Sequence, residues 1–424
     1  MTQSLSQARG RNYFFLISKI RERWKTDNEK LLRITTLIMS IMAGLWLGYQ
    51  FFRLVALQSY WGAIDLRVFL NQFRVFFSGI SLYVEGQIPP YPPASYLITG
   101  PILGWIDFAI ARWLWAALYI IALVVMASLI VRESGAESRA ERAFMSLLPL
   151  SVYATGATVG NGQWIVILLP ILLTGILMLR RAQTWRDDLL GAFLILVALV
   201  KPSVSVPFFW MVLFLRLRVA LIVMAVYIIL TLAAAFFQPS APWVLFANWL
   251  TGASGSVIAG GYSDINSWSF ALGTQSWNLH LTLLFLLVLG AWAYRHRHAD
   301  IWVLLGVSAT VARFWTYHNW YDDLLLLVPM IALYRIAKRG GPNGRHVIAG
   351  VLFALLIPAM LAPGGLYLFP QPLNFIYRFV QSFLWLAMLI FLLTNARNEE
   401  PLSNIQPELQ RRQSTAPIHL HKRY

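Results

Sequence analysis

The sequence has no cysteine and few charged residues. Only 12% of its 424 residues are charged, and 18 of them are Asp or Glu. The lack of cysteine excludes disulfides, thiolate metal sites and cysteine nucleophiles, and it leaves the compartment undetermined. A Walker loop, a dinucleotide-binding glycine fingerprint, an HExxH pair and an internal repeat are also missing. The functional residues must therefore be sought outside the common nucleotide-binding and zinc-binding motifs.

Apolar residues make up 58% of the chain, and the mean hydropathy is +0.62. This composition predicts an all-α, polytopic transmembrane helix bundle of about twelve spans, although several apolar runs are shorter than the ~20 residues that an upright span needs. Residues 94–106 are apolar but short and contain Gly100 and Pro101, so we expect a re-entrant or interfacial piece there. The twelve runs are 34–57, 113–131, 143–159, 165–179, 189–200, 204–215, 219–237, 279–294, 301–314, 324–334, 347–361 and 375–393.

Basic residues are distributed unevenly among the loops. With the N-terminus in the cytoplasm, 27 of the 34 Lys and Arg fall on that side, and the exceptions are Arg53, Arg67, Arg74, Arg112, Lys201, Arg313 and Arg378. The positive-inside rule then predicts a multi-pass protein of a bacterial cytoplasmic membrane. The net charge of +16 is explained by basic clusters that bind anionic lipid headgroups, so membrane lipids are expected partners and nucleic acid is not.

Three regions follow from this pattern. Residues 1–33 hold no cleavable signal and are expected to form a basic amphipathic helix on the cytoplasmic surface. Residues 34–395 form the membrane domain. Residues 396–424 are polar and rich in Gln, Pro and Arg, so a disordered cytoplasmic tail is predicted.

The first outer loop carries an amphipathic helix. From Asp65 to Gly79 the sequence reads DLRVFLNQFRVFFSG, in which Arg67, Asn71 and Arg74 recur at helical spacing away from an apolar stripe. We expect this helix to lie on the outer membrane surface. Asp65, at its start, has two interpretations: a helix N-cap, or a general base held near cations where a phosphate-bearing lipid docks.

Further polar residues interrupt apolar segments at the same outer level. Asn161 and Gln163 occupy a loop between spans, and Lys201-Pro202 breaks the segment 189–215. An intramembrane Lys is a candidate site residue, with snorkelling to the interface as the alternative.

Arg313 and His318 lie in another outer junction. His318 is a candidate for proton transfer or for a structural role. The surrounding Trp315, Tyr317, Trp320 and Tyr321 are expected to be interfacial anchors outside the site.

These residues suit one kind of chemistry. The cations Lys201, Arg313, Arg67 and Arg74 share a leaflet with Asp65 and His318. Cations stabilise a departing lipid-linked phosphate while a carboxylate deprotonates an acceptor hydroxyl, which is the division of roles in displacement at a sugar carbon.

The order of these elements resembles glycosyltransferase family 87. It runs from Asp65 and the amphipathic helix through residues 79–83, Tyr91-Pro92-Pro93, Gly162-Gln163 and Lys201-Pro202 to His318 and Tyr321-Asp322. The resemblance covers roughly residues 34–395.

The resemblance implies a GT-C fold and inverting transfer of a hexose, with mannose as the expected sugar and an α-1,2 linkage. The donor would be a polyprenyl-phosphate sugar, and a glycolipid or glycan would accept the sugar on the outer face. Asp65 would be the base, and Gln163, Lys201 and His318 would hold the donor phosphate or sugar.

Three residues have weaker acceptor-side roles. The loop 239–278 is longer than a plain connector, so Asp264 is either part of an acceptor-side lid or, as we favour, a turn residue. Asp322 and Tyr91 are further acceptor or lid candidates. No cofactor is expected, and the sequence leaves open whether a divalent cation bridges Asp65 and a phosphate.

Two other functions fit a polytopic chain. A flippase for lipid-linked saccharides would place polar residues near mid-membrane, whereas here they gather at the outer level. An O-antigen ligase or polymerase would be expected to carry a large hydrophilic outer loop with clustered Arg, and the outer loops here are modest.

Overall fold

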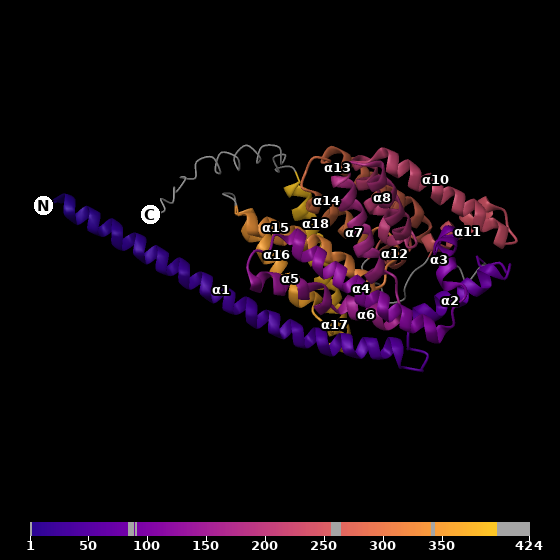
Figure 1. Cartoon of the computed structure of the whole chain (residues 1–424), viewed down its shortest axis with the longest axis horizontal. Coiled ribbons are helices and arrows are strands. Elements are labelled where there is room, and N and C mark those ends of the chain that lie inside the picture. The colour runs from indigo at the N-terminus through magenta and orange to yellow at the C-terminus, as the bar shows by residue number, and fades with distance from the viewer. Residues whose placement is uncertain (1, 84–88, 90, 256–263, 341–343, 397–424) are drawn as a thin grey trace, which may run out of the picture.

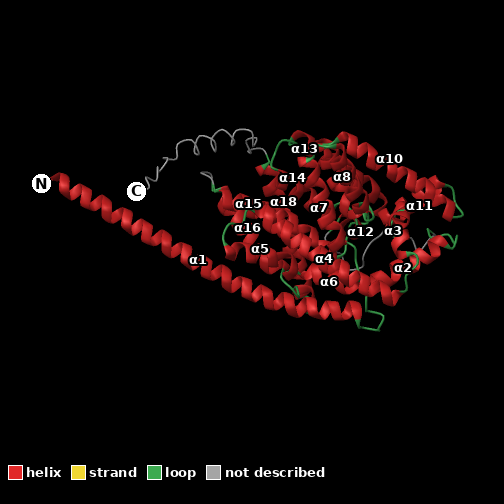
Figure 2. Ribbon diagram, in the orientation of Figure 1, coloured by secondary structure: helices red, strands yellow, loops and turns green. Residues whose placement is uncertain are grey.

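The chain is helical throughout the part that the structure describes. This computed structural model describes residues 2–83, 89, 91–255, 264–340 and 344–396, with the side chains of 2–28, 254 and 255 outside the description. Figure 2 shows helices joined by loops, and no strand occurs in these ranges apart from an isolated bridge between Val152 and Leu361. The all-α prediction is therefore confirmed, while the predicted tail 396–424 lies outside the described residues except for Ala396.

The elements follow one another with short connections. The first half of the chain contains α1 (Thr2–Val55), α2 (Ile64–Phe77), α3 (Pro93–Leu103), α4 (Phe108–Ser134), α5 (Arg139–Ser151), α6 (Tyr153–Asn161), α7 (Ile165–Arg181), α8 (Trp185–Ala198) and α9 (Pro202–Leu215). The second half contains α10 (Leu217–Ala234), η1 (Ala235–Phe237), α11 (Pro242–Gly255), α12 (Ile265–Ala271), η2 (Gln275–Trp277), α13 (Asn278–Arg295), α14 (Ile301–Phe314), η3 (Trp320–Leu326), α15 (Leu327–Arg339), α16 (Arg345–Met360), α17 (Gly365–Leu368) and α18 (Leu373–Asn395).

Several helices have the length and apolarity of membrane spans. In the described residues there are 5: Glu29–Val55, Phe108–Ser134, Leu217–Phe237, Gln275–Arg295 and Leu373–Asn395, or up to 6 if the bent pair α6 and α7 is counted as one span. Pro202–Leu215, Ile301–Phe314 and Arg345–Met360 are apolar but shorter. The twelve predicted runs thus correspond to a mixture of full-length spans and short or broken helices.

The N-terminal region forms one helix with the first span. α1 is 54 residues long, and Figure 1 shows its N-terminal part projecting well beyond the bundle. We expected a separate surface helix within residues 1–33. The continuity has a simple cause, because no proline or glycine stands between Asn12 and Ala43 to end the helix.

The predicted interruptions occur where small or cyclic residues stand. α8 ends before Lys201 and α9 begins with Pro202, whose missing N–H costs nothing at the first helical position. α6 and α7 meet at an angle of 116°. Gly162 makes this bend with a φ of 79°, in the left-handed region that glycine enters without strain. The short α3 agrees with a re-entrant or interfacial segment.

Three ion pairs mark one end of the bundle. Glu133 pairs with Arg181, Asp300 pairs with Arg335, and Glu141 pairs with Lys338. These residues come from loops that we expected on the cytoplasmic side. Arg181 ends α7, Asp300 precedes α14 and Arg335 and Lys338 lie in the second half of α15, whereas Gln163, His318 and Asp322 lie just beyond the other ends of these three helices. Gln163, His318 and Asp322 are therefore at the end of the bundle away from these ion pairs.

Contacts with the α6–α7 bend fix the start of α2. The N–H of Ala63 donates to the carbonyl of Gly160 at 3.1 Å, and Ala63 itself has a φ of 51°. A Cβ on Gly162 would lie 2.5 Å from the Cβ of Leu66, so the backbone of Gly162 packs directly against the side chain of Leu66. A left-handed alanine costs about 1–2 kcal/mol, and the surrounding contacts maintain it.

We expect Gly162→Ala to loosen this junction. Gly135→Ala is the matched control, since Gly135 has a φ of 76° but nothing within 4 Å of a Cβ. The control should cost about 1–2 kcal/mol through the left-handed backbone alone, and Gly162→Ala should cost roughly 1–3 kcal/mol more through overlap with Leu66. Thermal unfolding of both variants in detergent measures the difference. Equal midpoints would mean that the close approach to Leu66 is not a constraint.

Candidate functional site

Asp65 is half-buried and is not a helix cap. It is the second residue of α2, the cap position is Ala63, and no side chain forms a cap hydrogen bond there. Its Oδ2 atom is buried and has no hydrogen-bond partner in the described part of the chain. The N-cap interpretation is therefore wrong, and the carboxylate is directed into the protein with one oxygen unused.

The environment of Asp65 favours its neutral form. Burial raises the pKa of Asp65 to about 6, although a hydrogen bond from Gln163 and the charge of Lys201 both act to lower it. A carboxylate with such a pKa still holds a negative charge at neutral pH and binds a proton more tightly than an exposed Asp. Both properties suit a general base.

Gln163 joins Asp65 to two tyrosines. Its Nε2 donates to the hydroxyl of Tyr321 at 2.9 Å, and its Oε1 accepts from the hydroxyl of Tyr91 at 3.4 Å. The backbone of Gln163 is fixed as well, because its carbonyl accepts from Tyr119 at 2.6 Å. Burial raises the pKa of Tyr91 and of Tyr321, so both phenols stay protonated. Gln163 and Tyr91 thus lie beside Asp65, and their roles toward the donor and the acceptor stay predictions.

A buried carboxylate joins the two other main candidates. Asp322 Oδ1 accepts from Lys201 Nζ at 2.5 Å, and Asp322 Oδ2 lies 3.1 Å from His318 Nδ1. The Lys201 ammonium also lies 5.0 Å from the centre of the Tyr321 ring. Asp65, Gln163, Tyr321, Lys201, Asp322 and His318 consequently form one connected series of contacts.

The charge state of Asp322 sets the tautomer of His318. Burial raises the pKa of Asp322, but the Lys201 charge and the His318 hydrogen bond outweigh it, so the pKa lies well below the ordinary value. An ionised carboxylate only accepts hydrogen bonds, and His318 Nδ1 therefore carries a proton. His318 Nε2 is buried without a partner among the described residues. In the neutral ring this atom is the one that accepts a proton.

Asp264 reaches the same cluster through the backbone. It is the N-cap of α12: its Oδ1 accepts from the N–H of Ser267 at 2.9 Å, and its Oδ2 accepts from the N–H of His318 at 3.4 Å. Asp264 is therefore a cap that also holds the His318 main chain, rather than only a turn residue. The predicted lid around it includes residues 256–263, which lie outside the described residues.

Arg313 belongs to a second buried network. It forms an ion pair with Asp323, and Asp323 also accepts from the hydroxyl of Tyr153. Only 1% of the Arg313 side chain is exposed. Arg313 is thus paired with Asp323, which follows Asp322 in η3. The Arg313–Asp323 ion pair therefore helps to hold η3 in place.

Three candidates lie away from this cluster. Asn161 Oδ1 accepts from Arg53 at 3.1 Å, so the amide serves the end of α1. Arg67 and Arg74 project from α2 roughly 200° and 180° around the helix from Asp65, at 100° per residue. They line a pocket that Asp65, Lys201 and His318 do not line.

Sequence reasoning missed Tyr321 and Asp323. We expected Tyr321 to be an interfacial anchor, but only 4% of it is exposed and its hydroxyl accepts from Gln163. The Asp322-Asp323 pair could have indicated a role for Asp323. Two adjacent acids beside an apolar run need partners if they are buried.

In the ranges that the structure describes, no group of three or more His, Asp or Glu residues is arranged so that it could hold a metal ion. The expectation that the protein needs no cofactor stays a prediction.

Comparison with known protein families shows which family the chain matches. The model of a family described as Glycosyltransferase family 87 matches residues 90–333, which is more than half of the chain. The curated proteins and the solved structures gave no match. The matched region includes Gln163, Lys201, His318 and Asp322, whereas Asp65 precedes it.

We expect the ion pair between Lys201 and Asp322 to be needed for stability. Lys201→Met leaves a buried carboxylate without its cation and should cost about 3–5 kcal/mol, whereas Lys201→Met/Asp322→Asn removes both charges and should recover part of that loss. The unfolding temperatures of the two variants in detergent test this. A double variant no more stable than the single one would contradict the pairing.

Proposed function

The chain belongs to glycosyltransferase family 87 and is a membrane glycosyltransferase, and from this premise we propose the reaction that it performs. It moves a hexose, with mannose as the expected sugar, from a polyprenyl-phosphate donor to a glycolipid or glycan acceptor. The reaction takes place on the outer face of a bacterial cytoplasmic membrane, in a helical bundle of the GT-C type. The proposed product carries an α-1,2 linkage.

The observation that carries this proposal is the unused oxygen of Asp65. Asp65 Oδ2 is buried without a partner in the described part of the chain, beside Gln163 and within electrostatic reach of Lys201. A buried, unpaired carboxylate oxygen is costly unless it serves a substrate. An acceptor hydroxyl supplies the hydrogen bond that this oxygen lacks.

The reaction is a single displacement. The acceptor oxygen attacks C1 of the hexose from the side opposite the phosphate, and the bond between C1 and the phosphate oxygen breaks. The phosphate leaves with the electron pair, and Asp65 takes the hydroxyl proton. Attack from the opposite side inverts the configuration at C1.

Lys201 is the proposed cation for the donor phosphate. An ammonium has three donors, and Asp322 uses one of them, which leaves two for phosphate oxygens. Asp322 keeps Lys201 in place beside the Tyr321 ring. His318, fixed by Asp322 through Nδ1, presents Nε2 as a further polar atom for the donor or the acceptor.

An apolar groove beside Lys201 suits the prenyl chain. It has a volume of about 910 Å³ and lies between α9, α10 and α11, with Leu199 and Pro202 on either side of Lys201 in its wall. Its lining is almost entirely apolar, and it includes Tyr227, Trp243 and Trp249. A hydrocarbon chain in this groove would bring its phosphate end to the level of Lys201.

The family and the site favour a transferase over the alternatives. A flippase carries substrate without forming a bond and has no need of a base such as Asp65. An O-antigen ligase or polymerase shares the lipid-linked donor, but the match to family 87 favours transfer of a single sugar.

We expect Asp65→Asn to abolish sugar transfer while the protein still folds. The amide keeps the size of the side chain and loses its basicity, so the rate should fall by about 10²–10⁴. The assay uses purified protein in liposomes with a panel of polyprenyl-phosphate sugars. Asp107→Asn is the matched control, because Asp107 is exposed and makes no cap hydrogen bond. Normal turnover by Asp65→Asn would refute the proposal.

The pH profile should report the same carboxylate. Asp65 acts in its ionised form, and its pKa is raised to about 6. Hence kcat/KM should be level at neutral pH and fall about tenfold per unit below pH 6 as the base becomes protonated. An inflection near the ordinary Asp pKa would show that the raised value does not govern catalysis.

A further inference from the structure

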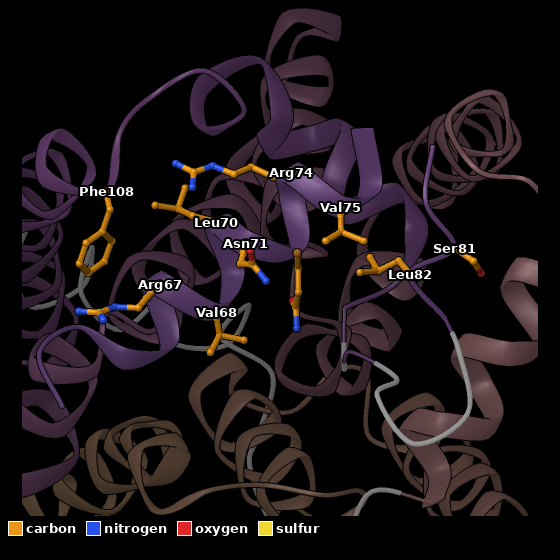
Figure 3. Close-up of a pocket in the computed structure, with 10 residues that line it drawn as sticks. Arg67, Val68, Leu70, Asn71, Arg74, Val75, Ser81, Leu82 and Phe108 are labelled. Atoms are coloured by element: carbon orange, nitrogen blue, oxygen red, sulfur yellow. The ribbon is translucent and has the colours of Figure 1, made fainter. Parts of the chain in front are cut away.

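A second pocket lies on the other side of α2. It has a volume of about 560 Å³, and its polar lining consists of Arg67, Asn71, Gln72, Arg74 and Ser81. Phe108, the first residue of α4, forms its edge. Figure 3 shows Arg67 and Arg74 extending toward the same side of α2 as Phe108. The proposed reaction uses none of these side chains.

The body of α2 separates this pocket from Asp65. At 100° per residue, Arg67, Asn71 and Arg74 lie roughly 200°, 240° and 180° around the helix from Asp65. Arg74 is also nine residues further along, or about 13 Å of helix. The buried stripe that includes Phe69 and Phe73 holds the helix against the bundle between the two faces. A ligand in this pocket is therefore distinct from one bound at Asp65.

The pocket has uncompensated positive charge. Arg67 and Arg74 form no ion pair with any carboxylate in the described residues, and the exposed Asp107 beside Phe108 pairs with neither. Arg112 lies close enough for its charge to repel that of Arg67.

Arg67 is fixed in place but not saturated. Its guanidinium stacks 4.7 Å from the centre of the Phe108 ring, and its Nη2 makes one long contact of 3.5 Å with the carbonyl of Ser59. Its Nε is buried and has no partner in the part of the chain that the structure describes. A positioned arginine with unused donors binds an anion, and its planar fork matches phosphate oxygens.

The surroundings of the pocket indicate a membrane lipid. Exposed aromatic residues stand nearby in the chain on both sides. Tyr60 and Trp61 precede α2, Trp105 and Trp113 flank Phe108, and the exposed fractions of these four residues are 61–88%. Such residues gather at the level of lipid headgroups. A lipid headgroup at this level would present its phosphate to the pocket.

We propose that the pocket formed by Arg67, Asn71, Arg74 and Ser81 binds the phosphate of an anionic phospholipid headgroup. The two arginines bind the phosphate oxygens, and the amide and hydroxyl groups bind the polar groups attached to it. The volume of about 560 Å³ accommodates a headgroup. The site operates whether or not Asp65 catalyses sugar transfer.

The test is lipid binding to the purified, delipidated full chain by native mass spectrometry. Phosphatidylglycerol and phosphatidylcholine are titrated separately in detergent. The wild type should retain one phosphatidylglycerol molecule in preference to phosphatidylcholine. Arg67→Gln/Arg74→Gln should weaken this binding at least tenfold, and Arg74→Gln alone, at an exposed side chain, should show an intermediate loss.

A second double variant controls for total charge. Arg186→Gln/Arg218→Gln removes two exposed arginines from the other end of the bundle and should leave phosphatidylglycerol binding unchanged. Asp65→Asn should also leave it unchanged, which separates this site from the proposed reaction. Equal binding by all variants would overturn the proposal. Inorganic phosphate that binds with the same arginine dependence, in the absence of phosphatidylglycerol binding, would overturn it too, because the ligand would then be a free anion.

Discussion

The carboxylate of Asp322 is the group on which the site depends. It is buried, and it binds Lys201 through one oxygen and His318 through the other. A lysine in an apolar segment is costly without such a partner, and a lone buried carboxylate would be equally costly. Because one acid satisfies both residues, the break between α8 and α9 and the junction after α14 are held together. Lys201, which we propose binds the donor phosphate, is therefore held in a fixed geometry.

The position of Asp65 depends on backbone rather than on charge. Gly162 adopts a left-handed conformation and leaves room for Leu66, and the N–H of Ala63 binds the carbonyl of Gly160. These contacts set the first turn of α2 against the α6–α7 bend, and the side chain of Gln163 then reaches the Asp65 carboxylate. The carboxylate of Asp65, the proposed base, is thus oriented by the helix contacts and by Gln163, without a hydrogen bond to its second oxygen.

The sequence predicted the helical class and the interruptions, and it singled out Lys201, His318 and Asp65, which the structure places in one series of contacts. Lys201, His318 and Asp65 stood out because charged residues are rare in this chain and because proline and glycine mark helix breaks. Arg67 and Arg74 were grouped with Asp65 because they share a leaflet and a polar pattern, although helical periodicity places both on the opposite side of α2 from Asp65. Tyr321 resembled an interfacial aromatic residue, and only the fold shows that it is buried beside Lys201. The length of α1 was missed because a change in polarity does not end a helix.

Charge balance explains why the two polar regions of this end of the bundle differ. At the proposed catalytic site Lys201 is paired with Asp322, and in the adjoining network Arg313 is paired with Asp323, so these cations attract little anion by themselves. At the outer pocket Arg67 and Arg74 have no such partner within the described chain. A donor whose phosphate must leave after reaction is better served by a cation whose charge is shared, because tight binding of the product phosphate would slow its release. A structural lipid has no such requirement, and unshared arginines bind it more strongly.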